Sequence, residues 1–418
     1  MKCDDCVTAE PKPLKPVDEA LSFLLEQVKV VSDTEEIDTA LALGRVLAEP
    51  VTSTINVPAW DNSAMDGYAF KFDDVAEGQP VRVSQRIPAG YEGTPLESGS
   101  AARIFTGAPV PDGADTVVMQ EHCLAYSEGD KDFVKIEKKP KAGANIRRAG
   151  EDVAVDEVVL KSGTKLQPQH LGLAASVGNA TLTVYRKLKV AIFSSGDELV
   201  MPGEPLAAGK IYNSNRFSLL GLLEKLNCEV IDLGMVEDTL DATCDALARA
   251  SGEADLILAS GGVSVGEEDH VKPAVEKLGS LQLWKIAVRP GKPLAYGHVN
   301  QVPFIGAPGN PVSLFVTFCV FALPWIKKQQ GMCGDLQPTA IPCIADFDWH
   351  RPDKRREYAR ARIKANGLGQ LMAEVYPSRS SGVLSSVTWA DGLVVIEPGE
   401  IIHKGDQVKF IAFNELLS

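Results

Sequence analysis

The sequence lacks a long uninterrupted apolar run, because every segment of membrane-spanning length contains charged residues, glycine or proline. The first 20 residues carry acidic residues and prolines where a secretion signal would be apolar, so we expect a cytoplasmic protein that does not bind a membrane. Basic residues are fewer than acidic ones: the sequence has 42 lysines and arginines and 56 aspartates and glutamates, so the formal net charge is −14. This balance disfavours a general binder of nucleic acid or anionic membranes.

Several catalytic and metal-binding signatures are missing as well. The eight cysteines are scattered over 418 residues, which favours reduced thiols over a disulfide framework. Cys3 and Cys6 have the spacing of a metal or redox site but no second pair, so we assign them no role. The six histidines lack zinc-site spacing, and no serine–histidine–aspartate or cysteine–histidine arrangement stands out. A covalent nucleophile is therefore not indicated.

The most informative stretch is residues 257–269, in which an apolar strand ends in small residues and is followed by an acidic cluster. Gly261, Gly262 and Gly266 would let the backbone approach a ligand closely, as at the phosphate-binding edge of an α/β sheet. The acidic cluster predicts a cation, because carboxylates alone would repel a phosphate. The stretch lacks the GxGxxG order of a dinucleotide fold and the Gly-Lys-Ser/Thr of a Walker loop. A glycine-rich turn that serves only the fold is the alternative interpretation.

The first half of the chain predicts two interleaved domains. Apolar spacing predicts helices at 17–28 and 34–46, and residues 69–140 alternate short β-type runs with turns. In residues 153–186 the chain is expected to return to the region of the first helices. We therefore expect a discontinuous domain that is interrupted by a β domain. The predicted boundaries are 1–52 and 150–186 for the linking domain and 53–149 for the inserted β domain.

The second half predicts an α/β domain at 187–329 and a C-terminal β-barrel at 330–418. Strands and helices alternate in the α/β segment, which is typical of helices flanking a mostly parallel sheet. The predicted strands are 188–194, 228–233, 255–260, 282–288 and 302–305. The predicted helices are 215–226, 240–251, 270–278 and 311–327. The fold class is therefore a multidomain α/β plus β protein.

Charged side chains follow the predicted strands of the α/β domain. The carboxyl ends of parallel strands meet at one sheet edge, so we expect five side chains to converge: Glu198, Asp238, Asp269, Arg289 and Lys292. Ser313 opens a helix, whose N-terminus would attract an anion. Carboxylates suit Mg²⁺ bound with phosphate oxygens, and the cations, serine and backbone N–H groups suit oxyanions. These residues predict a metal-dependent phosphoryl or nucleotidyl enzyme with a second oxyanion site, without naming its substrate.

Seven motifs together resemble one known family. They are DNSAMDGYA at 61–69, IFTGAPVP at 104–111, NIRRAGED at 145–152, SSGDEL at 194–199, SGGVSVGEED at 260–269, RPGKP at 289–293 and GAPGNPVS at 306–313. In this order they are similar to the MoeA family of molybdopterin molybdenumtransferases, which includes the gephyrin E domain. The resemblance extends from about residue 15 to the end of the chain.

The resemblance implies an activity and an assembly. The family inserts molybdenum from molybdate into adenylylated molybdopterin with Mg²⁺ and releases AMP, which is the last step of molybdenum cofactor synthesis. The resemblance also implies an elongated homodimer of four-domain subunits, in which the α/β domain of one subunit faces the β domain of the other. Transient contact with the molybdopterin adenylyltransferase and with downstream cofactor-processing enzymes is a further expectation.

Site residues follow from the resemblance by motif position. It implies catalytic roles for Asp61, Thr106, Asp152, Glu198, Asp238, Asp269, Lys285 and Arg289, with Asp238 and Asp269 handling the metal. It implies substrate binding by Ser63, Gly261, Gly262, Ser264, Gly266, Lys292, Ser313, Arg355 and Ser381. Lys292, Ser313, Arg355 and Ser381 would form the molybdate pocket, with Arg356 and Ser380 as alternatives to the last two. The family often has lysine at the position of Arg289, so the sequence leaves the choice between molybdate and tungstate open.

Two other functions are compatible with parts of this pattern. A molybdopterin adenylyltransferase would share the α/β domain but would consume ATP and would not need the DNSAMDGYA loop or the barrel. A non-catalytic carrier or scaffold would bind the pterin without needing the acidic residues. The complete set of motifs favours the molybdenumtransferase.

Overall fold

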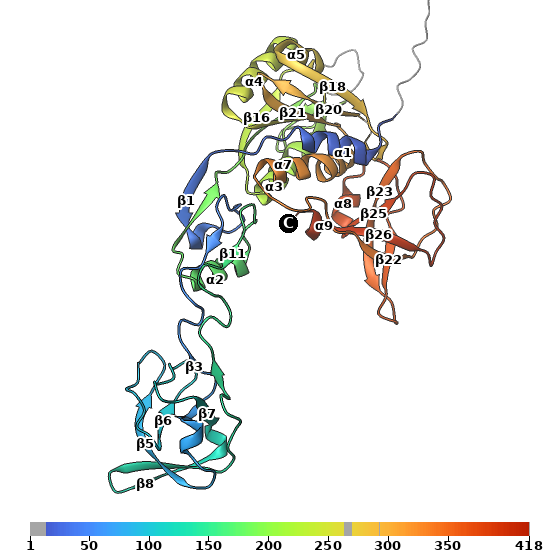
Figure 1. The fold of residues 1–418 in the computed structure, drawn as a ribbon. Helices are drawn as coiled ribbons and strands as arrows, with labels where there is room; N and C mark the ends of the chain where they lie inside the picture. Colours follow the sequence, from blue (N-terminus) through green and yellow to red (C-terminus); the bar gives the residue numbers. More distant parts are fainter. Residues whose placement is uncertain (1–13, 263–269, 292, 418) are drawn as a thin grey trace, which may run out of the picture.

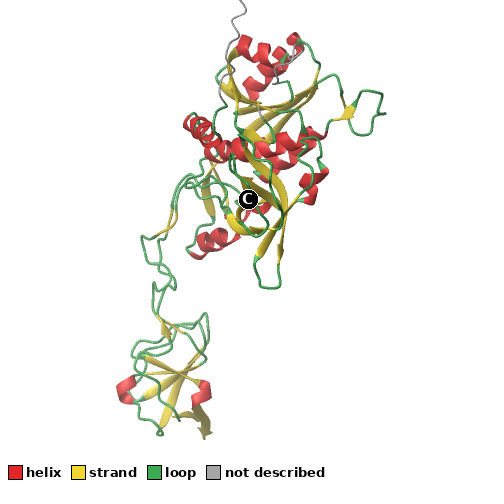
Figure 2. Cartoon of the chain, turned by 90° about the vertical axis from the view of Figure 1, so that its right-hand side faces the viewer, coloured by secondary structure: helices red, strands yellow, loops and turns green. Residues whose placement is uncertain are grey.

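The computed structural model describes residues 14–262, 270–291 and 293–417. The molecule is elongated, and the inserted β domain lies at one end, well separated from the α/β sheet and the C-terminal barrel (Figure 1). Viewed from the side, mostly loop segments connect this β domain to the rest of the chain (Figure 2). The extended shape expected from the family resemblance is therefore present in a single chain.

The N-terminal region confirms one predicted helix and corrects the other. Helix α1 (Val17–Glu26) buries Val17, Leu21 and Leu24 in the core of the α/β domain. The helix predicted at 34–46 is wrong. Strand β1 (Thr34–Asp38) pairs there with β12 (Thr181–Tyr185), and a 3₁₀ helix (Thr39–Leu41) follows. The partner strand lies far along the chain, so the local apolar spacing could not reveal it.

The chain leaves this region and returns to it, as expected. Strand β2 (Val51–Thr52) pairs with β11 (Val158–Leu160), and α2 (Pro168–Ser176) lies beside them before β12 closes on β1. Ala42, Leu47, Val51, Leu160 and Val184 form one small core across both passages of the chain. The predicted domain boundaries themselves stay predictions.

The inserted β domain is a six-stranded sheet in the order β7-β4-β6-β5-β9-β8. Its strands are β4 (Gly67–Phe70), β5 (Pro80–Ile87), β6 (Ser100–Ile104), β7 (Thr116–Met119), β8 (Cys123–Glu128) and β9 (Lys131–Ile136). Two 3₁₀ helices, Phe72–Asp74 and Gln120–His122, connect them. A short pair, β3 (Asn62–Ser63) with β10 (Ile146–Arg147), lies at the end of the domain that faces the linking region (Figure 1).

The α/β domain contains a six-stranded sheet in the order β16-β13-β17-β21-β20-β18. The first four strands are parallel: β16 (Glu229–Val236), β13 (Lys189–Ser195), β17 (Leu256–Ser260) and β21 (Val302–Ala307). Helices α3 (Ser214–Lys225), α4 (Leu240–Glu253) and α5 (Val271–Leu278) confirm three predicted helices. A short ribbon, β14 (Leu199–Val200) with β15 (Ile211–Tyr212), precedes α3.

Two features of this sheet differ from the prediction. Strand β20 (Pro293–Val299) was not predicted, and it pairs antiparallel with both neighbours. The strand predicted at 282–288 instead ends earlier, as β18 (Gly279–Lys285), and is followed by the separate β19 (Val288–Arg289). Strand β19 pairs with the barrel rather than with the α/β sheet, which explains why one apolar run divides into two strands.

The helix predicted at 311–327 is continuous but not uniform. It consists of α6 (Pro311–Thr317), a π-helical turn (Phe318–Ala322) and α7 (Leu323–Gln329). Its length and composition would allow it to span a membrane, yet 72% of its most apolar window is buried inside the protein. Phe318, Phe321 and Trp325 lie in the largest core cluster, so this segment is a core helix.

The C-terminal region forms the predicted β-barrel. Its strands are β22 (Ile341–Ala345), β23 (Arg356–Ala365), β24 (Leu371–Val375), β25 (Gly392–Ile396) and β26 (Gln407–Ala412). The ring closes because β23 pairs with β25 as well as with β24. The short helices α8 (Ser385–Trp389) and α9 (Phe413–Leu416) pack against it. Since β19 adds to β23, the barrel is attached to the α/β domain through a shared sheet.

Candidate functional site

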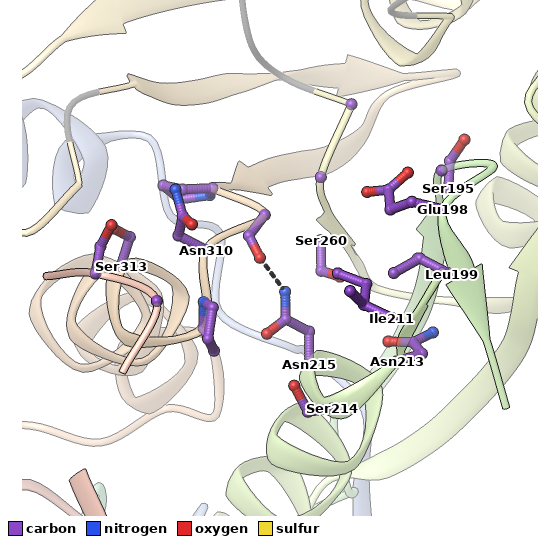
Figure 3. Close-up of a pocket in the computed structure, with 18 of the residues that line it drawn as sticks. Ser195, Glu198, Leu199, Ile211, Asn213, Ser214, Asn215, Ser260, Asn310 and Ser313 are labelled. Carbon is purple, nitrogen blue, oxygen red and sulfur yellow. Dashed lines mark hydrogen bonds between the residues drawn. The ribbon is translucent and has the colours of Figure 1, made fainter. Parts of the chain in front are cut away.

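A cleft of about 950 Å³ lies where the parallel strands of the α/β domain end and the barrel begins (Figure 3). The loops after β13, β16, β17 and β21 all contribute to it, as expected for the carboxyl edge of a parallel sheet. Residues from the barrel, including Arg355 and Ser381, form part of its wall. The cleft is therefore built from two domains of one chain.

One side of the cleft is acidic. Asp238 follows β16 and accepts a hydrogen bond from the Ser195 hydroxyl at the end of β13, across 3.0 Å. Glu198 lies on the turn after β13 beside Ser195 (Figure 3). Gly261 brings the β17 loop close to this turn, because its φ is +89° and a Cβ there would lie 3.2 Å from the Ser195 carbonyl oxygen. The glycine is thus needed for the close approach of the two loops.

The other side of the cleft suits an oxyanion. Ser313 lies in the first turn of α6 and is 3% exposed, and the N-terminal end of the continuous helix carries partial positive charge. The Val312 backbone N–H donates to the Ser381 carbonyl oxygen (3.0 Å), which joins the barrel to this helix end. Gly291 (φ +93°) packs against the same helix, because a Cβ there would lie 2.9 Å from the Thr317 hydroxyl.

The alternative arginines and serines have different surroundings in the structure. Arg355 lines the cleft and donates from Nε and Nη2 to the two carboxylate oxygens of Asp353, at 3.0 and 2.9 Å. Arg356 instead pairs with Asp18 (2.6 Å) and Glu397 (2.8 Å). Arg355 and Ser381 line the cleft, whereas Arg356 and Ser380 are not among its lining residues. Arg355, followed by Arg289, holds the pKa of the Asp353 carboxyl well below its usual range.

The predicted site residues of the C-terminal half divide into three groups. The first group lines the cleft and comprises Glu198, Asp238, Gly261, Gly262, Ser313, Arg355 and Ser381. The second group lies outside the described residues and comprises Ser264, Gly266, Asp269 and Lys292. The third group, Lys285 and Arg289, does not line the cleft. Lys285 is exposed at the end of β18, and Arg289 pairs with Asp353 at 2.8 Å.

The four predicted residues of the N-terminal half lie on or beside the inserted β domain and do not line the cleft. Figure 1 shows β3 and β6 of this domain at the opposite end of the molecule from β16 and α3, next to which the cleft lies. Asp61 forms an ion pair with Arg148 and accepts the Ala149 backbone N–H at 2.9 Å. The Ala149 N–H, followed by the Arg148 guanidinium, lowers the pKa of Asp61. One chain therefore does not bring Asp61 and Asp238 into the same site.

The neighbouring turn is equally well fixed. The Thr106 backbone N–H and hydroxyl both donate to one carboxylate oxygen of Asp66, each at 2.8 Å. Asp152 is exposed, and its backbone N–H donates to the Val57 carbonyl oxygen. Ser63 is fully buried and its hydroxyl donates to the Met65 carbonyl oxygen (2.6 Å), so its side chain holds the turn in shape.

The donor set of the cleft fits a hard divalent cation that is shared with a ligand. Glu198 and Asp238 are the carboxylates that the described residues contribute to the cleft lining. Among the residues with described positions, no group of three or more His, Cys, Asp or Glu side chains could hold a metal ion. Mg²⁺ is commonly bound by one or two carboxylates together with substrate phosphates, so this set fits that mode rather than an all-protein cage.

Sequence reasoning missed two amides of the cleft, Asn213 and Asn215. The Asn213 Oδ1 accepts the Arg216 backbone N–H (3.2 Å), and the Asn215 Nδ2 donates to the Gly309 carbonyl oxygen (2.7 Å; Figure 3). The opposite amide atoms, Asn213 Nδ2 and Asn215 Oδ1, are buried without a hydrogen-bond partner among the described residues. Asn213 caps α3, which begins at Ser214, one residue before the predicted start at 215. An asparagine near a helix start is a capping signal, and that is the hint that the sequence gives of this position.

Comparison with known proteins agrees with this architecture. Residues 15–178 match the family described as MoeA N-terminal region (domain I and II), residues 191–328 match the probable molybdopterin binding domain, and residues 343–413 match the MoeA C-terminal region (domain IV). A molybdopterin molybdenumtransferase of Haemophilus influenzae is 40% identical over 96% of this chain and 99% of its own length. One from Bacillus subtilis is 33% identical over 92% of this chain and 90% of its own length.

A solved structure shows the same arrangement of domains. The molybdopterin biosynthesis MoeA protein from Pyrococcus horikoshii is similar with a TM-score of 0.81 and 30% sequence identity, over 96% of this chain and 100% of that chain. The matches cover the linking region, the inserted domain, the α/β domain and the barrel together. The chain therefore belongs to the MoeA family.

Proposed function

We propose that this protein inserts molybdenum from molybdate into adenylylated molybdopterin and releases AMP. The single observation that carries this proposal is the division of the cleft into an acidic side with Glu198 and Asp238 and an oxyanion side with Ser313, Arg355 and Ser381. The proposed reaction needs both sides, since a phosphoanhydride must be cleaved next to a tetrahedral oxyanion. Relatives that match almost the whole chain carry the name molybdopterin molybdenumtransferase.

The cleft residues have separate tasks in this reaction. Asp238 and Glu198, with Asp269, would hold Mg²⁺, which when bound neutralises charge on the phosphoanhydride. Ser195 fixes the Asp238 carboxylate by donating to it. Asn213 and Asn215 line the cleft and would bind polar groups of the substrate, since each has one amide atom without a hydrogen-bond partner among the described residues. On the other side, Lys292, Ser313, Arg355 and Ser381 would hold molybdate, and the Arg355 guanidinium suits the edge of a tetrahedral anion.

We further propose that the working unit is a homodimer with composite sites. The turns that carry Asp61 and Thr106 are held by hydrogen bonds to Arg148 and Asp66 and do not line the cleft of the same chain. They belong to the inserted β domain, which is well separated from the α/β sheet (Figure 1). A second subunit would bring its own Asp61 and Thr106 turns to this cleft. Free thiols at all described cysteines support a reducing compartment, and we place the enzyme in the cytoplasm.

The experiment that tests this function is an assay of AMP release. Purified protein is incubated with adenylylated molybdopterin and Mg²⁺, with and without molybdate, and AMP is followed by chromatography. We expect AMP release that requires both molybdate and Mg²⁺ and is unaffected by ATP. Consumption of ATP would identify an adenylyltransferase instead. Tight binding of the substrate without AMP release would identify a carrier.

A further inference from the structure

Asp353 is a carboxylate at the edge of the predicted molybdate pocket, and sequence reasoning gave it no role. It lies on the segment that precedes β23 and is bound by two arginines that are far apart in the sequence. Arg355 donates to it from Nε (3.0 Å) and Nη2 (2.9 Å), and Arg289 on β19 donates from Nη1 (2.8 Å). The Arg355 backbone N–H adds a fourth hydrogen bond at 3.1 Å.

This contact fixes the orientation of Arg355 but does not use up its hydrogen-bonding capacity. A guanidinium has five N–H groups, and Asp353 accepts from one on Nε and one on Nη2. Among the residues that the structure describes, no acceptor is bound by the two N–H groups on Nη1 or by the second on Nη2. Arg355 lines the cleft together with Ser313 and Ser381, on the side where an oxyanion would bind.

A negative charge beside an anion site needs a physical reason, because it repels the ligand. The surrounding charges supply one. Arg379 lies 3.9 Å from Asp353 and pairs with Glu357, a carboxylate that is 2% exposed, and Arg289 lies 3.7 Å from the same Glu357. Three guanidiniums thus surround two carboxylates, and the group keeps a positive surplus. Without Asp353, the arginines would repel one another around a single carboxylate.

We propose that Asp353 is a positioning residue that presents the Arg355 guanidinium to molybdate in a fixed orientation. The proposal rests on the proposed function, because it assumes that the cleft binds molybdate through Arg355. Asp353 holds the long arginine side chain before the ligand arrives, so binding does not have to order it. Asp353 also ties Arg355 to Arg289 on β19, the strand that adds to the barrel sheet.

The test compares Asp353→Asn and Asp353→Glu with the wild type in the full-length protein. Asn removes the charge, and Glu keeps the charge but shifts the carboxylate by one methylene. We expect both variants to bind molybdate roughly tenfold more weakly or worse in calorimetry, and to raise the KM for molybdate while the KM for adenylylated molybdopterin changes little. Asp346→Asn is the matched control, since Asp346 pairs with Lys404 at 2.6 Å elsewhere on the barrel and does not line the cleft.

A double-mutant cycle shows whether Asp353 acts through Arg355. We expect Arg355→Lys to weaken molybdate binding in the wild-type background and to add little in the Asp353→Asn background. Unchanged or tighter molybdate binding in Asp353→Asn, wild-type binding in Asp353→Glu, or additive effects in the cycle would each overturn the proposal. Failure of the proposed function is a distinct result, because the wild-type protein itself would then release AMP without molybdate or not at all.

Discussion

Asp238 accepts a hydrogen bond from the Ser195 hydroxyl at 3.0 Å, and this contact joins the ends of two neighbouring parallel strands, β16 and β13. The serine thus orients a carboxylate that lies in the cleft. Removing only the charge of Asp238 separates its role as a ligand from its role in the fold, because the amide oxygen of an asparagine can still accept the same hydrogen bond.

Asp238→Asn should therefore fold normally and lose most of its activity. We expect kcat/KM to fall by roughly 100-fold or more and the Mg²⁺ concentration for half-maximal activity to rise, because the cation loses a charged ligand. Steady-state assays across a Mg²⁺ titration measure both effects. Asp241→Asn is the control, since Asp241 is exposed in the first turn of α4 and does not line the cleft. Equal activity in the two variants would remove Asp238 from the metal site.

Gly291→Ala should destabilise the protein and distort the oxyanion side of the cleft. The glycine has φ +93°, and an added Cβ would lie 2.9 Å from the Thr317 hydroxyl and 3.5 Å from the Ser313 Cβ. We expect a cost of about 1–3 kcal/mol, seen as a lower Tm, together with weaker molybdate binding.

Gly221→Ala provides the matched comparison within helix α3. A Cβ at Gly221 would have no neighbour within 4 Å among the described residues, and helices favour alanine over glycine. We expect an unchanged or higher Tm and unchanged molybdate binding for this variant. A Gly291→Ala protein that is as stable as Gly221→Ala would show that the 289–291 turn relaxes freely.

Arg360→Met should weaken molybdate binding without touching the ligand. Arg360 is 2% exposed and donates from Nη2 to the carbonyl oxygens of Ser378 (2.6 Å) and Ser380 (3.2 Å), so it holds the loop that carries Ser381. We expect a loss of roughly 10- to 100-fold in molybdate affinity by calorimetry. Lys364→Met on the same strand is the control, because Lys364 forms an exposed pair with Glu374. Similar molybdate affinities in both variants would contradict a positioning role for Arg360.

The stability of the protein should depend on pH through His298. Burial, followed by the charge of Lys29, lowers the pKa of His298 from its ordinary value of 6.5. Because the pKa of this histidine is lower in the folded state, acidification protonates it in the unfolded state first. Its contribution to the free energy of unfolding is therefore fully present above about pH 6.5 and declines as the pH falls below that value. Thermal unfolding between pH 5 and 8 should show a steeper loss of Tm on acidification in the wild type than in His298→Asn. Parallel curves would exclude this histidine as the cause.

Much of the fold could be predicted because the relevant signals are local. The parallel strands β13 and β16 are short, mostly apolar runs, and the rule that the carboxyl ends of parallel strands meet at one edge correctly brought Glu198 and Asp238 together. Strand β1 could not be predicted, because the pairing of Glu36 with Thr183 lies outside any local window. A helical spacing of apolar residues within 34–46 was therefore misleading.

The candidate site could also be predicted where its signals are local, and could not be predicted where it depends on distant partners. The charged loops were found from their position after strands, but the choice between Arg355 and Arg356 depends on tertiary partners that lie far away in the sequence. Arg356 is drawn to Asp18 on α1, and this leaves Arg355 in the cleft. Asn213 and Asn215 were not predicted as site residues, because asparagines at a helix start are usually caps. Only the structure shows that Asn213 Nδ2 and Asn215 Oδ1 have no hydrogen-bond partner among the described residues.

We propose that Asp61 of one subunit and Asp238 of its partner act in the same site. Mixing two inactive variants, Asp61→Ala and Asp238→Ala, tests it most directly after subunit exchange at equal concentrations. A composite site predicts recovery of molybdate-dependent AMP release to roughly a quarter of the wild-type rate, because about half of the dimers are mixed and each has one intact site. No recovery, in a mixture shown by mass spectrometry to contain mixed dimers, would contradict the claim.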